Sequence, residues 1–150
     1  MKRRTLLQKV PAAAMLLSPA VWATSQAGGS EAARSSTGVY ELRVYHVASG
    51  KLPDLLARFR DHTIKLFEKH GMKSVAYWVP LDEPERSSTL IYILHHPSRE
   101  AATANWKSFG DDPDWQSVRD KSEANGKLVE KVDSTFMSLT DFSSHPSSKS

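Results

Sequence analysis

Residues 89–95 read Thr-Leu-Ile-Tyr-Ile-Leu-His, a run rich in β-branched and aromatic side chains without glycine or proline. This composition predicts a β-strand. Alternation places apolar residues on both of its faces, Ile91 and Ile93 on one and Leu90, Tyr92 and Leu94 on the other. A strand that is apolar on both faces requires cover on both sides.

The chain before this strand predicts three further elements. Residues 39–47 alternate between apolar and polar side chains, which indicates a strand. Apolar residues then recur at helical spacing over 52–70, and Gly71 ends the helix as a C-cap. A second strand covers 72–79, and residues 80–87, with two prolines and four charged side chains, form a turn.

The chain after this strand predicts a helical stretch followed by a last strand. Ser98 can cap a helix that runs through Phe109. Residues 110–113 break this helix, and a shorter one follows over 114–125. The last strand covers 129–139.

The resulting order is β-α-β-β-α-β, which predicts an α+β fold of the ferredoxin-like type. Its four strands form an antiparallel sheet with both helices on one face. The other face must then pack on something, because the central strand is apolar on both sides. A second sheet, supplied by a symmetric homodimer, is the simplest cover.

Residues 1–27 have the three parts of a secretory signal peptide: a basic start, an apolar run of 14 residues over 10–23, and small residues before a cleavage site. Cleavage after Ala23 and cleavage after Ala27 fit equally well. The apolar run is shorter than the ~20 residues of a spanning helix, so we expect no stable membrane anchor.

Arg3 and Arg4, followed by one free position and two leucines, resemble a twin-arginine export signal. Leu6 stands where phenylalanine is commoner, and a general secretory signal remains the alternative. Either route predicts a periplasmic or secreted bacterial protein. The twin-arginine route adds the twin-arginine export machinery as a partner.

The chain of 150 residues has room for one domain, which we place at 39–142 between a flexible linker at 28–38 and a disordered tail at 143–150. The net charge of +3 comes from the first 27 residues, which hold four basic side chains and no acidic one. The rest of the chain therefore gives no electrostatic reason to expect nucleic acid as a partner. The absence of cysteine excludes disulfides and thiolate chemistry.

Several segments together resemble the NIPSNAP family. They are Tyr-Glu-Leu-Arg at 40–43, a helix that ends in His-Gly at 70–71, and Asp-Pro-Asp-Trp at 112–115. The resemblance covers about 39–141 and implies a dimeric α/β barrel in which two sheets face each other. It implies no settled reaction, since proteins of similar fold include cofactor-independent monooxygenases and haem-degrading enzymes.

Candidate ligand-binding residues lie on the first two strands. Glu41, Arg43 and Tyr45 share one face of the first strand, which would line the barrel cavity if Leu42 and Val44 packed on the helices. An ion pair between Glu41 and Arg43 could hold a carbonyl or acidic ligand, or could be purely structural. Trp78 could form a stacking wall of the same cavity or could pack in the core.

The histidines do not predict a metal site. His95 and His96 are adjacent on a strand, so their side chains point to opposite faces. We expect His95 to face the cavity and His96 to leave the sheet before the next proline. His62 and His70 lie two turns apart, too far to share an ion. The aromatic residues of the second helical stretch, Trp106, Phe109 and Trp115, are expected in the core.

The sequence contains no phosphate-binding loop, serine elbow or zinc-protease motif. We therefore predict no cofactor and no metal. Two functions remain open: binding of a small hydrophobic or aromatic molecule, or of a protein partner, in a dimeric barrel, and a small cofactor-independent oxygenase or isomerase. In the enzyme, the catalytic candidates are Arg43 to hold an oxyanion and Tyr45 or His95 to move a proton.

Overall fold

The computed structural model describes residues 38–144. The predicted signal peptide and nearly all of the predicted linker and tail lie outside these residues. The strands are β1 (Val39–Val47), β2 (Lys73–Trp78), β3 (Thr89–His96) and β4 (Val129–Met137). They form one antiparallel sheet in the order β2-β3-β1-β4, which confirms the predicted ferredoxin-like fold.

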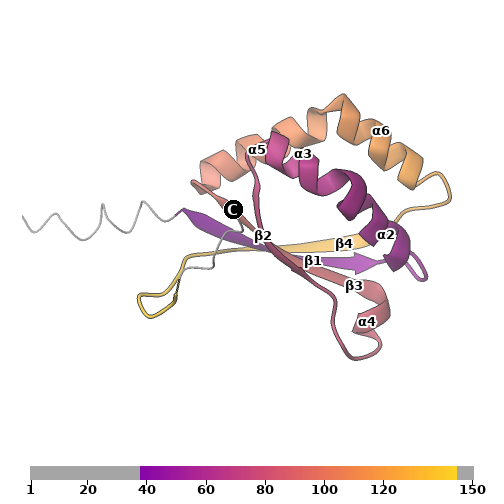
Figure 1. Ribbon diagram of the computed structural model, residues 1–150, viewed down its shortest axis with the longest axis horizontal. Coiled ribbons are helices and arrows are strands. Elements are labelled where there is room, and N and C mark those ends of the chain that lie inside the picture. Colours follow the sequence, from indigo (N-terminus) through magenta and orange to yellow (C-terminus); the bar gives the residue numbers. More distant parts are fainter. Residues whose placement is uncertain (1–37, 145–150) are drawn as a thin grey trace, which may run out of the picture.

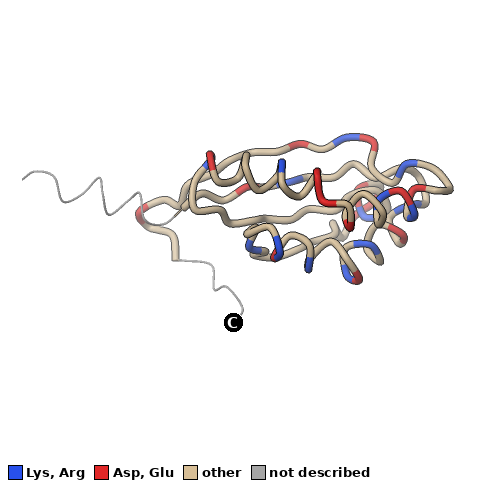
Figure 2. Tube along the Cα trace, turned by 90° about the horizontal axis from the view of Figure 1, so that it is seen from above, with Lys and Arg blue, Asp and Glu red and all other residues tan. Residues whose placement is uncertain are grey.

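The helices lie along one face of this sheet (Figure 1). The first is α2 (Leu52–Arg58), which continues through a π-helical segment (Phe59–Thr63) into α3 (Ile64–Lys69). The second helical stretch on this face consists of α5 (Arg99–Asp111) and α6 (Pro113–Ser122). Positive and negative side chains are interspersed along the trace instead of being separated by sign (Figure 2).

Three details of the sequence prediction are corrected. The helix over 52–70 is not uniformly α-helical, because it contains the π-helical segment. The connection over 80–87 includes a short helix, α4 (Glu85–Ser88), at the end of the β2–β3 hairpin (Figure 1). The last strand ends at Met137, two residues earlier than expected.

The register of the sheet fixes which side chains face the helices. Tyr45, Arg43 and Glu41 of β1 lie opposite Leu90, Tyr92 and Leu94 of β3, whose side chains are buried in the core under the helices. The residues between them face the other way, where no described element covers the sheet. This open face carries apolar side chains from all four strands, including Leu42, Val44, Val75, Trp78, Ile91, Ile93 and Met137.

The core between sheet and helices is largely aromatic. Phe67 is 1% exposed and contacts Trp106 and Phe109 at ring distances of 5.4 and 5.1 Å. Phe109 in turn lies 4.5 Å from the ring of Trp115. The expectation that Trp106, Phe109 and Trp115 pack in the core is therefore confirmed.

The predicted helix signals are also confirmed. Gly71 has a φ of +73°, and it and Met72 donate to the carbonyls of Glu68 and Phe67 at the end of α3. This is the bonding pattern that favours glycine after a helix. Ser98 accepts a hydrogen bond of 3.1 Å from the backbone N–H of Ala101 at the start of α5.

The Ser98 cap gives a first prediction. Ser98→Ala leaves the Ala101 N–H without its acceptor, so we expect the free energy of unfolding to fall by ~1 kcal/mol. Urea denaturation followed by circular dichroism measures it. The control is Thr103→Ala on the exposed part of the same helix, where Thr103 Oγ1 bonds the Arg99 carbonyl. If both variants lose equal stability, Ser98 does not act as a cap.

Candidate functional site

The structure separates the predicted site residues onto the two faces of the sheet. Glu41, Arg43 and Tyr45 point toward the helices, whereas Trp78 and His95 lie on the open face. The expectation that all five line one cavity is therefore wrong. The more apolar residues of β1 were expected to pack under the helices. Instead, polar groups from distant elements satisfy the charged pair there.

Glu41 is the centre of a buried hydrogen-bond network. Its side chain is 2% exposed, and its two oxygens accept four hydrogen bonds. Arg43 Nη1 and Ser134 Oγ each donate to Oε1 at 2.7 Å. Trp106 Nε1 and His96 Nε2 donate to Oε2 at 2.7 and 3.0 Å. Every strong acceptor position of this carboxylate is thus occupied.

These donors set the protonation state of Glu41. Burial alone raises the pKa of Glu41, but the hydrogen bonds from His96, Trp106, Ser134 and Arg43 outweigh it and lower the pKa to about 2. The carboxylate is therefore ionised at neutral pH and surrounded by donors. It is poorly suited to act as a general acid or base and well suited to a structural role.

Arg43 is held between aromatic rings beside this carboxylate. Its guanidinium lies 4.1 Å from the ring of Trp106 and 5.6 Å from that of Tyr45. Burial lowers the pKa of Arg43, but the nearby Tyr92, Tyr45 and Glu41 outweigh burial and raise the pKa above its usual value. The side chain therefore stays charged. Burial also raises the pKa of Tyr92, which donates a 2.9 Å hydrogen bond to the Tyr45 hydroxyl.

The two adjacent histidines have different environments from those expected. His96 does not leave the sheet: it is the last residue of β3, 0% exposed, and bonded to Glu41. The register continues one residue further than expected because Val39 pairs with His96. His95 lies on the open face, where its ring is 4.9 Å from that of Tyr40.

The open face contains an apolar groove at one end. Its volume is about 180 Å³, and its walls come from all four strands and from the chain that follows β4. The residues that line it are Tyr40, Val75, Ile93, Met137, Ser138, Leu139, Thr140 and Ser143. Trp78, on the same face, is 46% exposed. The groove and Trp78 are where an apolar ligand or a second sheet could make contact.

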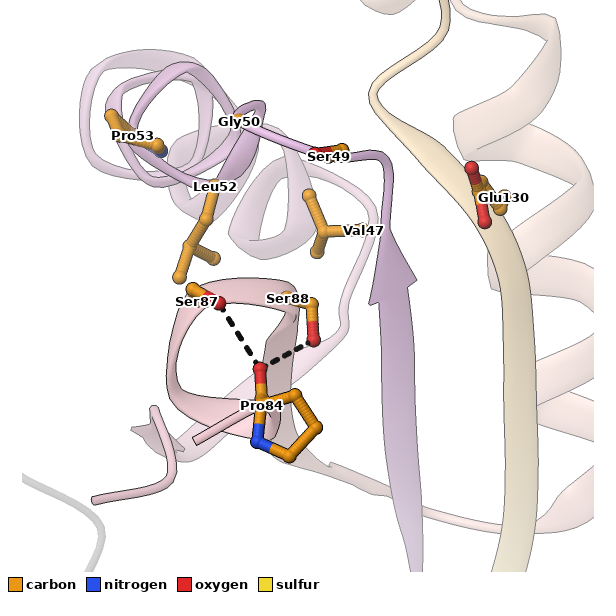
Figure 3. A pocket seen from close by; sticks show the side chains of 9 residues that line it. All are labelled: Val47, Ser49, Gly50, Leu52, Pro53, Pro84, Ser87, Ser88 and Glu130. Carbon is orange, nitrogen blue, oxygen red and sulfur yellow. Dashed lines mark hydrogen bonds between the residues drawn. The ribbon is translucent and has the colours of Figure 1, made fainter. Parts of the chain in front are cut away.

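A larger hollow of about 690 Å³ lies at the end of β1, between the start of α2 and the loop that contains α4 (Figure 3). Two of the three serine hydroxyls on its wall, those of Ser87 and Ser88, donate to the Pro84 carbonyl. Glu130 is the one charged side chain among its lining residues. The hollow therefore has few polar groups directed at a ligand.

The described residues lack two other kinds of feature. No cluster of at least three His, Cys, Asp or Glu side chains within 38–144 could hold a metal ion. No helix in the same range is both long and apolar enough to cross a membrane. His70, considered above as a metal ligand, instead bonds Asp112 and Ser108.

Sequence reasoning missed three partners of Glu41. Trp106 and Ser134 lie 65 and 93 positions away along the chain. His96 was expected to leave the sheet, whereas it bonds Glu41. A buried carboxylate requires compensating donors. That requirement could have directed attention to the indole N–H of a tryptophan on the covering helix, but no local pattern identifies which donor it is.

The sheet order and the helices on one face define a ferredoxin-like α+β protein. The sequence profile of the NIPSNAP family matches residues 40–144, so the chain belongs to this family. No curated protein sequence matches it significantly.

Several solved structures share the fold. A NIPSNAP family protein of unknown function from Agrobacterium tumefaciens has 21% identity and a TM-score of 0.61, over 72% of this chain and 93% of that one. An uncharacterised NIPSNAP-like domain protein from Burkholderia xenovorans has 13% identity and a TM-score of 0.63, over 75% and 94% of the two chains. A Streptomyces coelicolor monooxygenase, solved with nanaomycin D, has 17% identity and a TM-score of 0.51, over 78% and 99%. At these identities the likeness concerns the fold.

Proposed function

We propose that this NIPSNAP protein is an exported homodimer that binds a small apolar or aromatic molecule in the groove on the open sheet face. The observation that carries the proposal is the groove itself, whose lining is dominated by aliphatic and aromatic side chains. Its volume of about 180 Å³ is comparable to cavities of ~150 Å³ that bind benzene. A ligand with one ring or a short branched chain fits this size.

The composition of the open face supports the proposed dimer. Leu42, Val44, Ile91 and Ile93 form its centre, and no described part of the chain covers them. Contiguous apolar patches of this kind mark interaction surfaces. A second copy of the sheet would remove these side chains from water and close the groove. Export by the signal at residues 1–27, with cleavage after Ala23 or Ala27, would place this dimer in the periplasm.

Native mass spectrometry of the protein recovered from the periplasm tests the proposal. We expect the mass of a dimer trimmed after Ala23 or Ala27, with additional bound mass. Val44→Asp places a charge in the middle of the open face and should give a monomer. The matched control, Val132→Asp, carries the same change on the opposite face of β4, where Val132 is 37% exposed, and should remain dimeric.

A third variant separates ligand binding from dimer assembly. Val75→Phe adds side-chain volume to the groove wall, so we expect a dimer that has lost its bound mass. A trimmed wild-type monomer without ligand would contradict the proposal. So would a Val44→Asp variant that dimerises as the wild type does.

A second candidate is a cofactor-independent oxygenase or isomerase that uses the same groove. The observation that favours it is the contact between His95 and Tyr40, which places a group able to accept a proton beside the groove wall. Arg43 and Tyr45 could not act on a molecule in this groove, because they face the helices. If the protein is an enzyme, His95→Asn should abolish turnover of the bound molecule while the bound mass is retained. If it only binds, neither the wild type nor the variant turns the molecule over, and both retain the bound mass.

A further inference from the structure

A third cavity lies between α2 and α6, remote from the open sheet face. It has a volume of about 450 Å³, within the range of small-molecule sites. In contrast to the groove, its lining is mostly polar and charged. It includes Arg58, Asp61 and His62 from the first helix and Lys121 and Ser122 from α6.

Arg58 is a buried cation in the wall of this cleft with few hydrogen-bond partners. Its side chain is 5% exposed. Nη1 donates to Ser122 Oγ and to Glu123 Oε1, both at 3.2 Å. Nε is buried without a partner among the described residues, and Nη2 has none there either. A buried guanidinium donor without an acceptor is costly, so this arrangement favours a ligand that supplies one.

The guanidinium is also held in a fixed position. It lies 5.1 Å from the ring of Trp115. Arg58 is the last residue of α2 and directly precedes the π-helical segment. There, Thr63 Oγ1 donates to the Arg58 carbonyl at 3.2 Å, and the Ile64 N–H bonds the carbonyl of Phe59, five residues earlier. Single π-helical turns occur frequently at functional sites. The π-helical segment and the incompletely hydrogen-bonded Arg58 side chain therefore lie at the same cavity.

The charges in the cleft indicate the ligand class. Two further cations line the cavity, Lys121 on the rim and Lys51 at 3.7 Å from Asp54. Asp54 and Asp61 also line the cavity and would repel a multiply charged anion. Arginine matches the two oxygens of a carboxylate with parallel hydrogen bonds. Ser122 and Asn125 add groups that bond a hydroxyl. We infer that the α2–α6 cleft binds a small monocarboxylate with a polar substituent, such as a hydroxy acid, through the guanidinium of Arg58.

Nuclear magnetic resonance of the full chain tests this inference. The probe is 3-hydroxybutyrate, and its neutral analogue 3-hydroxybutyramide is the control ligand. We expect the carboxylate to shift the Arg58 Nε–H resonance in a saturable way and the amide to leave it unchanged. Arg58→Lys keeps the charge but loses the fork geometry, so the affinity should fall by about 10-fold. Lys121→Gln on the rim should cost roughly 2- to 3-fold.

Binding of both probes with equal affinity, or unchanged affinity in Arg58→Lys, would overturn the inference. Tighter binding of inorganic phosphate than of the carboxylate would overturn the assigned ligand class. If Arg58→Lys does not fold, the wild-type Nε–H resonance still decides the outcome. Val75→Phe, which fills the groove on the open face, should bind 3-hydroxybutyrate as the wild type does. The cleft and the proposed function are thereby tested separately.

Discussion

Replacing Glu41 with alanine should lower the free energy of unfolding by about 3 to 5 kcal/mol, because it removes the centre of the buried network. Arg43 would keep its charge without a counterion, and Trp106 and His96 would each lose an acceptor. Urea denaturation at pH 7 measures the change. Glu130→Ala, on an exposed part of β4, is the control and should change stability by less than about 0.5 kcal/mol.

The same carboxylate predicts how stability depends on pH. Folding lowers the pKa of Glu41 from 4.5 to about 2, so the unfolded chain binds this proton more tightly than the folded one. The stabilisation is fully present above pH 4.5 and is lost as the pH falls toward 2. Its size is about 3 kcal/mol.

Glu41→Gln isolates this contribution. The amide keeps the shape of the side chain but cannot ionise, and its NH₂ group faces donors instead of accepting from them. We expect lower stability at pH 7 and a flatter stability profile between pH 5 and pH 2. A variant as stable as the wild type at pH 7, with the same acid dependence, would show that the network contributes nothing to folding.

Local sequence signals were sufficient for the order of the elements. Alternation gave the bounds of β1 at Val39–Val47, and Ser98 and Gly71 marked helix ends correctly. Each of these signals involves residues within a few positions of one another. The double apolar character of residues 89–95 predicted cover on both faces, and the helices cover the face of β3 that carries Leu90, Tyr92 and Leu94.

The orientation of β1 could not be obtained in this way. Both of its faces carry large side chains, and the apolar count alone favours Leu42 and Val44 beneath the helices. The actual arrangement depends on Trp106 and Ser134, which approach Glu41 only after the chain has folded. The π-helical segment was missed for a related reason: an inserted residue hardly changes the apparent spacing of apolar positions in a helix of this length.

The two faces of β1 therefore have different chemistry. The helix side combines an aromatic core with a charge network whose hydrogen bonds are largely internal, which favours a structural role for Glu41 and Arg43. The open side offers apolar surface and the groove beside His95. Substitutions on the helix side should mainly alter stability, and substitutions on the open side should mainly alter assembly and binding.

Asp112→Ala is expected to have the second large effect, since Asp112 joins three helices. Its carboxylate is 3% exposed. Oδ2 accepts from Lys69 Nζ at 2.8 Å and from His70 Nε2 at 2.7 Å, both at the end of α3. Oδ1 accepts from the Asp114 N–H at 2.9 Å and so caps α6. The hydrogen bonds from Lys69 and His70 hold the pKa of Asp112 well below its usual range, so it is ionised at neutral pH.

We expect Asp112→Ala to lower the melting temperature by at least about 5 °C, because the cap and the contacts to α3 are lost together. Asp112→Asn can still cap α6 but has no charge for Lys69, so its effect should be smaller. Asp111→Ala is the matched control: the neighbouring side chain is 66% exposed and pairs with Lys107, one turn earlier. Differential scanning calorimetry of the three variants checks this order. Equal losses in Asp111→Ala and Asp112→Ala would mean that Asp112 does not connect the helices.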